Sequence, residues 1–451
     1  MHALKKRVHV GVVTRLQVVI GVVLLVSGVR WCAAAGVEKD EERVVATLGG
    51  YEVFESTLGE ENEFRALRTK KQESTTPEAV EKLQDEDEDE DDEGGASTGG
   101  ILGGVFTSGI ARGESVFAAF HVHEAVRLVA RDEVRPVMTA LQVGLGIGVV
   151  PTALKRHGIV VDAVEIDADV LEAARLYFGY RAAAHTTTGD GDSDEETMAV
   201  THGRDYVEDG AQFLQRGCEG SPDATPTGWS APYDFVIHDV WNGDFLSSST
   251  TSAWGEEEND DTDDALDDSG DDTTSSSSSL YMLETFEAAA CVMKDDGVFV
   301  LNYYGFAHAL DFAAVVTTLA HVFPNLRAFH DGNRDNVSGA PYNIAVFGRR
   351  DGHALVFRDP HADDLLGSES VRYDALYHLL EREISLPIPS SKTFASDTTA
   401  GDADHDAVPV LRASHNGAQI LWKLQRHVRD AHRREVLHHN HNHHNHDRDE
   451  L

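Results

Sequence analysis

Apolar runs of strand length alternate with amphipathic runs of helix length between residues 137 and 348. The first apolar run, 137–143, ends in a glycine-rich turn. Such alternation predicts an α/β fold, in which helices cover both faces of a mostly parallel sheet. The expected strands are 137–143, 159–166, 198–202, 233–240, 297–302, 326–330 and 342–348. The expected helices are 149–157, 168–178, 206–215, 280–294 and 307–323. We therefore expect a Rossmann-like domain with a seven-stranded sheet.

The turn after the first strand carries Gly144, Gly146 and Gly148. Glycines at this place let the chain turn sharply and let a ligand approach the backbone, and the next helix points its N-terminus at that ligand. The second strand ends at Glu165, where a carboxylate accepts hydrogen bonds from both hydroxyls of a ribose. Together these features predict a nucleoside-binding site.

Two further carboxylates follow later strands. Asp205 stands after the third expected strand, where it can accept a hydrogen bond from an adenine amino group or cap the next helix. Asp239 ends the fourth strand, and ligands of open α/β sheets lie beyond this edge. Asp239 is therefore the candidate catalytic residue, which accepts a proton from an amine or holds its cation.

Residues 115–348 resemble the spermidine synthase-like (polyamine biosynthesis) branch of the AdoMet-dependent transferases. The matching segments are ESVF (114–117), HEAV (123–126), GLGIG (144–148), VEID (164–167), GRD (203–205), YDFVIHD (233–239) and DDGVFVLNYYG (295–305). The resemblance implies an AdoMet-dependent methyltransferase fold. It also implies an enzyme that transfers an alkyl group, methyl or aminopropyl, to an amine. The donor would be S-adenosyl-L-methionine or decarboxylated S-adenosyl-L-methionine.

The resemblance assigns roles to particular residues. It implies a donor site made by Gly144, Gly146, Gly148, Glu165 and Asp205, and a catalytic carboxylate at Asp239. His123 corresponds loosely to a position that holds the donor in the synthases. Aminopropyl transferases carry an aspartate at each of two places where this chain has Ile147 and Asn242. Each missing carboxylate removes an anchor for a cationic amine and favours ordinary AdoMet, so both reactions stay open.

Two other function classes remain. A non-catalytic nucleoside-binding or scaffold protein of the same fold is consistent with the two missing carboxylates. An NAD-type dehydrogenase would also use the glycine turn and Glu165, but Asp239 would have no part in hydride transfer and no second substrate domain is evident.

The formal net charge of −40 is concentrated in three acidic runs, residues 85–93, 190–196 and 256–272. Blocks of like charge repel one another, so we expect solvated insertions. This charge argues against a nucleic-acid partner, because phosphate contacts need clustered Lys and Arg. The last run follows Asp239 and would concentrate a small amine or a basic peptide acceptor. Relatives in the family are often dimers, which suggests a homodimer.

The two ends of the chain predict a location. A basic start, an apolar run at 16–29 and Ala33-Ala34-Ala35 are typical of a cleaved signal peptide. The final four residues, Arg-Asp-Glu-Leu, resemble the retention address of the endoplasmic reticulum. We expect the lumen of the endoplasmic reticulum, with no membrane span after cleavage, and a membrane-anchored protein as the alternative.

The expected organisation follows from these patterns. It comprises a signal peptide (1–35), an N-terminal β segment with an acidic insertion (36–110), and a transferase-like domain (111–350) with insertions at 185–197 and 245–279. A helical extension (351–437) and a His-rich tail (438–451) complete it. The tail is interpreted as a spacer, and no metal site is expected. Cys218 and Cys291 could form one disulfide in an oxidising lumen, but nothing in their spacing indicates a bridge, so two free thiols are favoured and the bridge stays open.

Overall fold

The computed structural model describes residues 42–58, 62–70, 100–131, 135–181, 203–220, 230–240, 279–332, 341–387, 408–415, 417–421 and 423–428. Several expected features lie outside these residues. They are the signal peptide (1–35), the acidic run 85–93, the insertion 185–197, residues 245–278, the tail 438–451 and Asn242.

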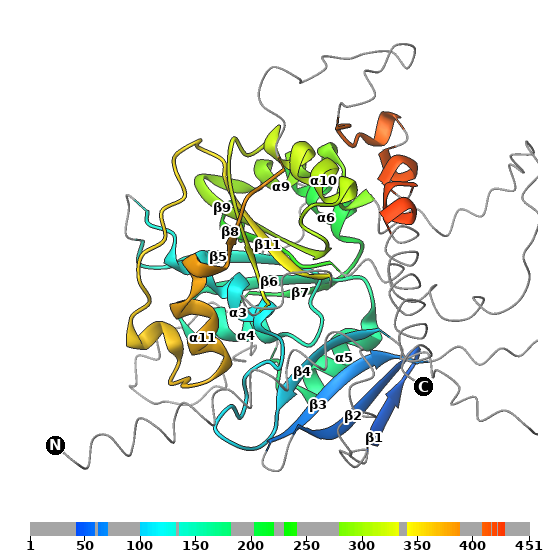
Figure 1. Ribbon diagram of the computed structural model, residues 1–451, viewed down its shortest axis with the longest axis vertical. Coiled ribbons are helices and arrows are strands. Elements are labelled where there is room, and N and C mark those ends of the chain that lie inside the picture. The colour runs from blue at the N-terminus through cyan, green and yellow to red at the C-terminus, as the bar shows by residue number, and fades with distance from the viewer. Residues whose placement is uncertain are drawn as a thin grey trace, which may run out of the picture.

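An eight-stranded mixed sheet forms the centre of the described structure (Figure 1). In spatial order its strands are β12 (Glu383–Ile384), β10 (Asn325–His330), β11 (Tyr342–Arg349), β9 (Met293–Gly305), β8 (Tyr233–His238), β5 (Thr139–Val143), β6 (Val160–Glu165) and β7 (Asp205–Val207). The five strands from β9 to β7 are parallel, and β11 and β12 run the opposite way to their neighbours. The expected α/β fold is confirmed, but the seven-stranded parallel detail is not, because β12 adds a strand from the segment after residue 350.

The clearest local difference from expectation follows Arg204. The predicted helix 206–215 is wrong at its start, because β7 pairs with β6 there and α6 spans Gly210–Glu219. Asp209, not Asp205, caps this helix by accepting a hydrogen bond from Gln212 N at 2.9 Å. The predicted strand 198–202 lies outside the described residues.

Helices cover both faces of the main sheet, as the alternating pattern predicted (Figure 1). One face packs against α6, α9 (Leu283–Cys291) and α10 (Leu310–Ala320), and the other against α3 (Ala118–Glu124), α4 (Val149–Arg156) and α11 (Val371–Tyr377). Successive residues of β9 point to opposite faces, so Phe299 joins the first layer and Val300 the second. Burial on both faces explains why these strands are nearly continuous apolar runs.

A separate antiparallel sheet precedes the main domain and confirms the expected N-terminal β segment. Its strands are β1 (Arg43–Leu48), β2 (Tyr51–Leu58), β3 (Asn62–Thr69) and β4 (Ile101–Phe106), in that order. The sheet packs against α5 (Ala168–Tyr177), and Val53 and Leu67 are fully buried in this contact (Figure 1). The small sheet therefore lies beside the glycine turn of the main domain.

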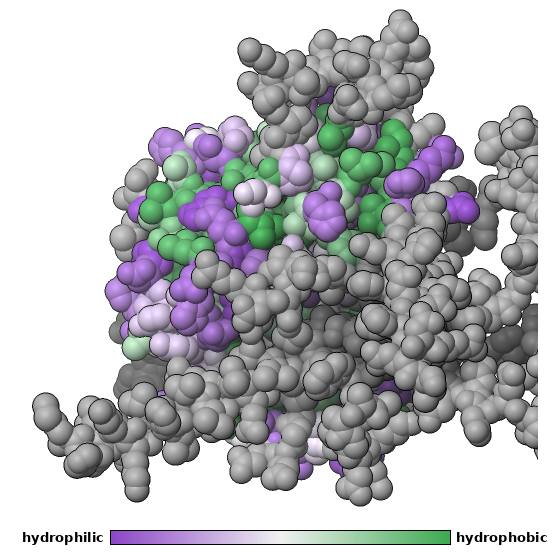
Figure 2. Space-filling view, in the orientation of Figure 1, coloured by the Kyte–Doolittle hydropathy of each residue, from purple (hydrophilic) through white to green (hydrophobic). Residues whose placement is uncertain are grey.

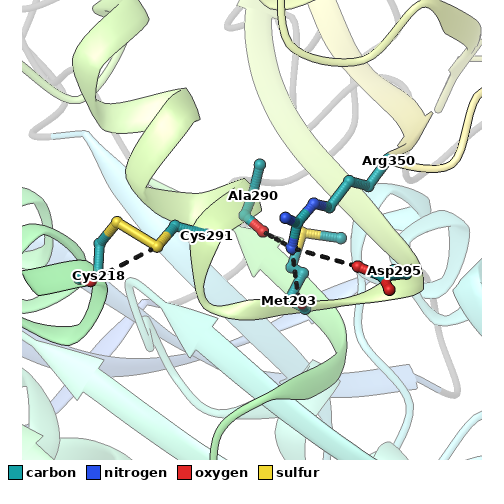
Figure 3. The surroundings of a disulfide bond; sticks show 6 residues. All are labelled: Cys218, Ala290, Cys291, Met293, Asp295 and Arg350. Carbon is teal, nitrogen blue, oxygen red and sulfur yellow. Dashed lines mark hydrogen bonds and ion pairs between the residues drawn. A yellow bond between two sulfur atoms is a disulfide. The ribbon is translucent and has the colours of Figure 1, made fainter. Parts of the chain in front are cut away.

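A disulfide joins Cys218, in the last turn of α6, to Cys291 at the end of α9 (Figure 3). The expectation of free thiols is wrong. The two helices pack side by side, which brings the Cα atoms to 5.4 Å, within the range that a disulfide spans. A separation of 73 residues in sequence could not show this proximity. Beside the bridge, Arg350 donates to the carbonyl oxygens of Ala290 and Met293 and fixes the turn from α9 into β9 (Figure 3).

The visible surface around the main sheet mixes polar and apolar residues (Figure 2). Within the described part of the chain, none of the helices has the length and hydropathy that a membrane span requires.

Candidate functional site

Three strand ends meet where β5 lies between β6 and β8. Gly144 N donates to Val164 O, and Asp239 N donates to Val143 O, each at 2.8 Å. The chain leaves β5 for β6 on one side, while β8 lies on the other, so this is the switch point at which open α/β sheets bind ligands. The glycine turn, Glu165 and Asp239 therefore share one edge of the sheet.

The three glycines of the turn are needed for different reasons, although all have a positive φ. A side chain at Gly144 would lie 2.0 Å from the carbonyl oxygen of Asp239, and one at Gly148 would lie 2.7 Å from the ring of Tyr180. At Gly146 the nearest atom would be 3.7 Å away. Gly144 and Gly148 thus allow close packing within the protein, and Gly146 is the glycine that leaves room for a ligand.

Glu165 is buried at the end of β6 and faces the turn. Its Oε2 accepts hydrogen bonds from Leu145 N at 2.9 Å and from Gly146 N at 3.4 Å, and its Oε1 accepts one from Asp167 N at 3.1 Å. Burial raises the pKa of Glu165, and the three backbone donors oppose that shift. An ionised carboxylate has about four lone-pair sites, so capacity for a ribose hydroxyl remains.

Two apolar side chains stand next to Glu165 with more than half of their surface exposed. Ile166 follows it directly, and Val207 of β7 pairs with it across the sheet. An exposed apolar pair beside a strand-end carboxylate provides a surface against which a planar base can pack.

Asp205 takes part in a network behind the turn. Its carboxylate accepts hydrogen bonds from the Tyr180 hydroxyl at 2.5 Å and from Arg175 Nη2 at 2.6 Å, and its side chain is almost fully buried. Since the ring of Tyr180 lies against Gly148, Asp205 helps to fix the turn. Its predicted contact with adenine stays a prediction.

Asp239 follows β8 and faces α3. Its Oδ1 accepts a hydrogen bond from Asn302 Nδ2 at 2.8 Å, and its Oδ2 lies 3.9 Å from Nδ1 of His123. Burial raises the pKa of the Asp239 carboxyl, against the lowering influence of His123 and Asn302. Burial also lowers the pKa of His123, so this imidazole is neutral at pH 7.

Several polar atoms of this cluster are available to a ligand. The ring nitrogens of His123 and Oδ1 of Asn302 are buried and make no well-formed hydrogen bond among the described residues, but the two side chains face each other closely enough for Asn302 to raise the pKa of His123. Buried polar atoms are normally well paired, so this loosely paired set at a strand edge suits a polar ligand. Its acceptors, Asn302 Oδ1 and Asp239 Oδ2, suit a group with N–H donors.

Tyr281 lies near Asp239 and follows the acidic insertion at 245–279. It is buried, and its hydroxyl donates a hydrogen bond to Val240 O at 3.3 Å. Burial, with the nearby charge of Asp239, raises the pKa of Tyr281, which therefore stays protonated.

Ile147 points away from the ligand side of the turn. It packs with Val53 and Leu67 of the N-terminal sheet, and a side chain added at Gly103 of β4 would lie 2.7 Å from it. The position where aminopropyl transferases carry an aspartate is therefore an apolar contact here.

Sequence reasoning identified part of this arrangement. It placed Gly144, Glu165 and Asp239 on one edge, and it located His123 only loosely. It missed Asn302, although a polar residue in the apolar run of β9 was a usable signal. Among the described residues, no group of three or more His, Cys, Asp or Glu side chains has an arrangement that holds a metal ion.

No protein-family model matches the chain. A curated protein, the N-terminal histidine N-methyltransferase from Emericella nidulans, is 28% identical over 276 residues, which is 60% of this chain and 39% of that protein. The chain is homologous to a methyltransferase. It spans about two fifths of the length of this relative. The more specific spermidine synthase-like relationship stays a prediction.

Solved structures with a similar arrangement include human methyltransferase-like protein 13 in complex with SAH and the spermidine synthase from Thermotoga maritima. The first is 21% identical with a TM-score of 0.32, covering 62% of this chain and 94% of that one. The second is 13% identical with a TM-score of 0.33, covering 74% and 86%. TM-scores this low support no argument about function.

Proposed function

We propose that this protein is an AdoMet-dependent N-methyltransferase that acts on a nitrogen of an N-terminal histidine. The observation that carries the proposal is the cluster of Asp239, Asn302 and His123, which presents loosely paired polar atoms beside the glycine turn. The homologous N-terminal histidine N-methyltransferase supports the choice of acceptor.

The residues around the turn fit the donor. Gly146 leaves space for the backbone to meet the donor, Glu165 would bind its ribose, and Ile166 and Val207 would pack against its base. When bound, the donor supplies a methyl group on a sulfonium. Ile147 supports ordinary AdoMet over the decarboxylated form, because this apolar contact holds no carboxylate for an ammonium.

The cluster performs the rest of the chemistry by orientation and proton transfer. Oδ1 of Asn302 and the carboxylate of Asp239 would accept N–H bonds from the acceptor and aim a nitrogen lone pair at the methyl carbon. An N–C bond forms while the C–S bond breaks, and one proton passes from the acceptor to Asp239. The neutral His123 places no positive charge beside the nitrogen, which becomes cationic as the N–C bond forms.

The test mixes the purified full-length protein with AdoMet and peptides that begin with histidine, alanine or N-acetylhistidine, and follows methylation by mass spectrometry. We expect methylation of the first peptide, with S-adenosylhomocysteine as the co-product. Release of methylthioadenosine from decarboxylated AdoMet would instead identify aminopropyl transfer to a polyamine. Failure to bind either donor would favour a scaffold protein.

Asp239→Asn tests the catalytic carboxylate against Asp295→Asn, whose side chain is fully exposed. Asp239→Asn should keep its affinity for AdoMet and lose turnover by roughly 100- to 10,000-fold, as expected for a lost general base. Since burial raises the pKa of Asp239, kcat/KM should fall with decreasing pH through a limb that lies above the ordinary pKa of an aspartate. An Asp239→Asn enzyme that turns over at the wild-type rate would exclude this role.

We also propose that the protein functions in the lumen of the endoplasmic reticulum. The disulfide between Cys218 and Cys291 supports this, because disulfides persist in oxidising compartments. A reporter fused to residues 1–40 and 444–451 should reside there and be released by carbonate extraction. A cytosolic reporter would exclude the proposal, and one that resists extraction would favour the membrane-anchored alternative.

A further inference from the structure

Helix α3, which carries His123, is held by buried charges that come from the other end of the chain. His121, His123 and Glu124 of this helix are fully buried. Arg372, near the start of α11 and itself 4% exposed, donates from Nε to Glu124 Oε2 at 2.9 Å. A residue of the segment after Arg350 thus pairs with the neighbour of a site residue.

Further contacts make this attachment rigid. The backbone N–H of Arg372 donates to Glu114 Oε2 at 2.9 Å, just before α3 begins, and Glu124 Oε1 lies 2.9 Å from Nδ1 of His121. Burial alone would raise the pKa of Glu124, but the charges of Arg372 and His121 outweigh it and lower this pKa to about 2. The carboxylate is therefore ionised at neutral pH, and the helix is fixed at both ends.

The site itself provides little to hold His123 in place. The imidazole makes no well-formed hydrogen bond among the described residues: Asn302 faces it and raises its pKa, and its Nδ1 lies 3.9 Å from Asp239 Oδ2. Its position relative to Asp239 therefore depends on where α3 lies. Apolar packing holds α3, and Glu114 and Glu124 add polar contacts to the segment after Arg350. Arg127, just after the helix, pairs with Asp364 at 2.9 Å.

We propose that Arg372 is a positioning residue, which holds α3, and with it His123, against Asp239. The catalytic consequence rests on the proposed function, whereas the effect on α3 does not. A site that depends on distances between α3 and β8 should lose turnover when the helix shifts, because a misplacement of about 1 Å can reduce a rate roughly 100-fold.

The test compares the full-length wild type with Arg372→Met, Arg372→Lys and Arg358→Met. Arg358→Met is the control, because Arg358 lies in the same C-terminal segment and bonds to Asp364, which stays paired with Arg127 just after α3, and not to α3 itself. Hydrogen exchange of residues 116–124, the AdoMet dissociation constant and the methylation rate of a histidine-first peptide are measured for each.

Arg372→Met should speed exchange in α3 and lower kcat by about 100-fold, while the AdoMet dissociation constant stays within about twofold because the glycine turn is untouched. Arg372→Lys, which keeps the charge and one donor, should recover part of kcat. Arg358→Met should match the wild type in both respects. If Arg372→Met does not fold, Glu124→Gln, which retains the shape and removes the charge, serves in its place.

Unchanged exchange in α3 would overturn the proposal whatever the activity. Faster exchange with unchanged kcat would overturn the link to the site. If the wild type transfers no methyl group, the proposed function fails separately. The measure of positioning is then hydrogen exchange in α3 alone, which Arg372→Met should speed and Arg358→Met should not.

Discussion

Gly144 and Gly146 stand two residues apart in one turn, yet different physical demands fix them. A side chain at Gly144 would clash with the backbone of Asp239, whereas one at Gly146 would only reach the carbonyl oxygen of Leu102, at an ordinary contact distance of 3.7 Å. A glycine pattern in a sequence cannot separate these demands, because both require the absence of a side chain. The pattern indicated a ligand at all three glycines. Only the packing of the neighbouring strand β8 distinguishes Gly144 from Gly146.

Gly144→Ala and Gly146→Ala should therefore differ in their effects. Gly146→Ala should lower the free energy of unfolding by about 1–2 kcal/mol through its left-handed backbone and weaken AdoMet binding. Gly144→Ala should cost about 3 kcal/mol or more, because its methyl group meets a backbone carbonyl that β8 holds in place. Urea unfolding and a calorimetric AdoMet titration measure both quantities, and equal losses of stability would contradict this division.

Carboxylates at strand ends were the most predictable residues of the site. Glu165 and Asp239 were found because the ends of parallel strands share an edge, which the order of elements alone implies. The side-chain partner of Asp205 could not be found this way, since Tyr180 reaches it through a tertiary contact. Asn302 was not predicted, because its hydrogen bond to Asp239 depends on β9 lying next to β8.

At the scale of elements, the long apolar strands were predictable and the short ones were not. A strand buried on both faces has a clear sequence signature, and β5, β6, β8 and β9 all have it. β7 and β12 are three and two residues long, and only pairing with a neighbour makes them strands. The disulfide was mispredicted for the same reason, because it depends on how two helices pack.

The disulfide between α6 and α9 should stabilise the fold considerably. It closes a segment of 73 residues that includes Asp239, and the chain-entropy account predicts about 4 kcal/mol for a loop of this size. Cys218→Ser with Cys291→Ser should lower the urea midpoint accordingly. A reducing agent should lower the midpoint of the wild type and leave that of the double variant unchanged. Equal midpoints for oxidised wild type and double variant would show that the bridge contributes nothing.

At the scale of the whole molecule, the segment after Arg350 belongs to the core of the main domain. Leu355, Phe357 and Leu376 are buried with residues of β10, β11 and α3. The sequence suggested a helical extension beyond the domain, since its pattern weakens after residue 350. That weak pattern reflects short elements, α11 and two 3-10 turns (Ala362–Leu365 and Leu379–Arg382), whose positions depend on the surface they cover.

Two neighbouring substitutions test this integration. Phe357 is buried between the rings of Phe329 and Phe347, each 5.1 Å away between ring centres, whereas Val356 beside it is 56% exposed. Phe357→Ala should reduce the free energy of unfolding by about 3–5 kcal/mol. Val356→Ala should change it by less than about 0.5 kcal/mol. Similar small effects in thermal unfolding would mean that the segment is only loosely attached.

The hydrogen bond between Tyr281 and Val240 has a consequence for evolution and engineering. It ties together the two points between which residues 241–278 are inserted. Chain added between neighbouring anchors costs only a slowly growing closure entropy. This connection can therefore lengthen, shorten or accept a foreign domain while the catalytic edge keeps its geometry, which makes it the natural place to graft a new recognition module.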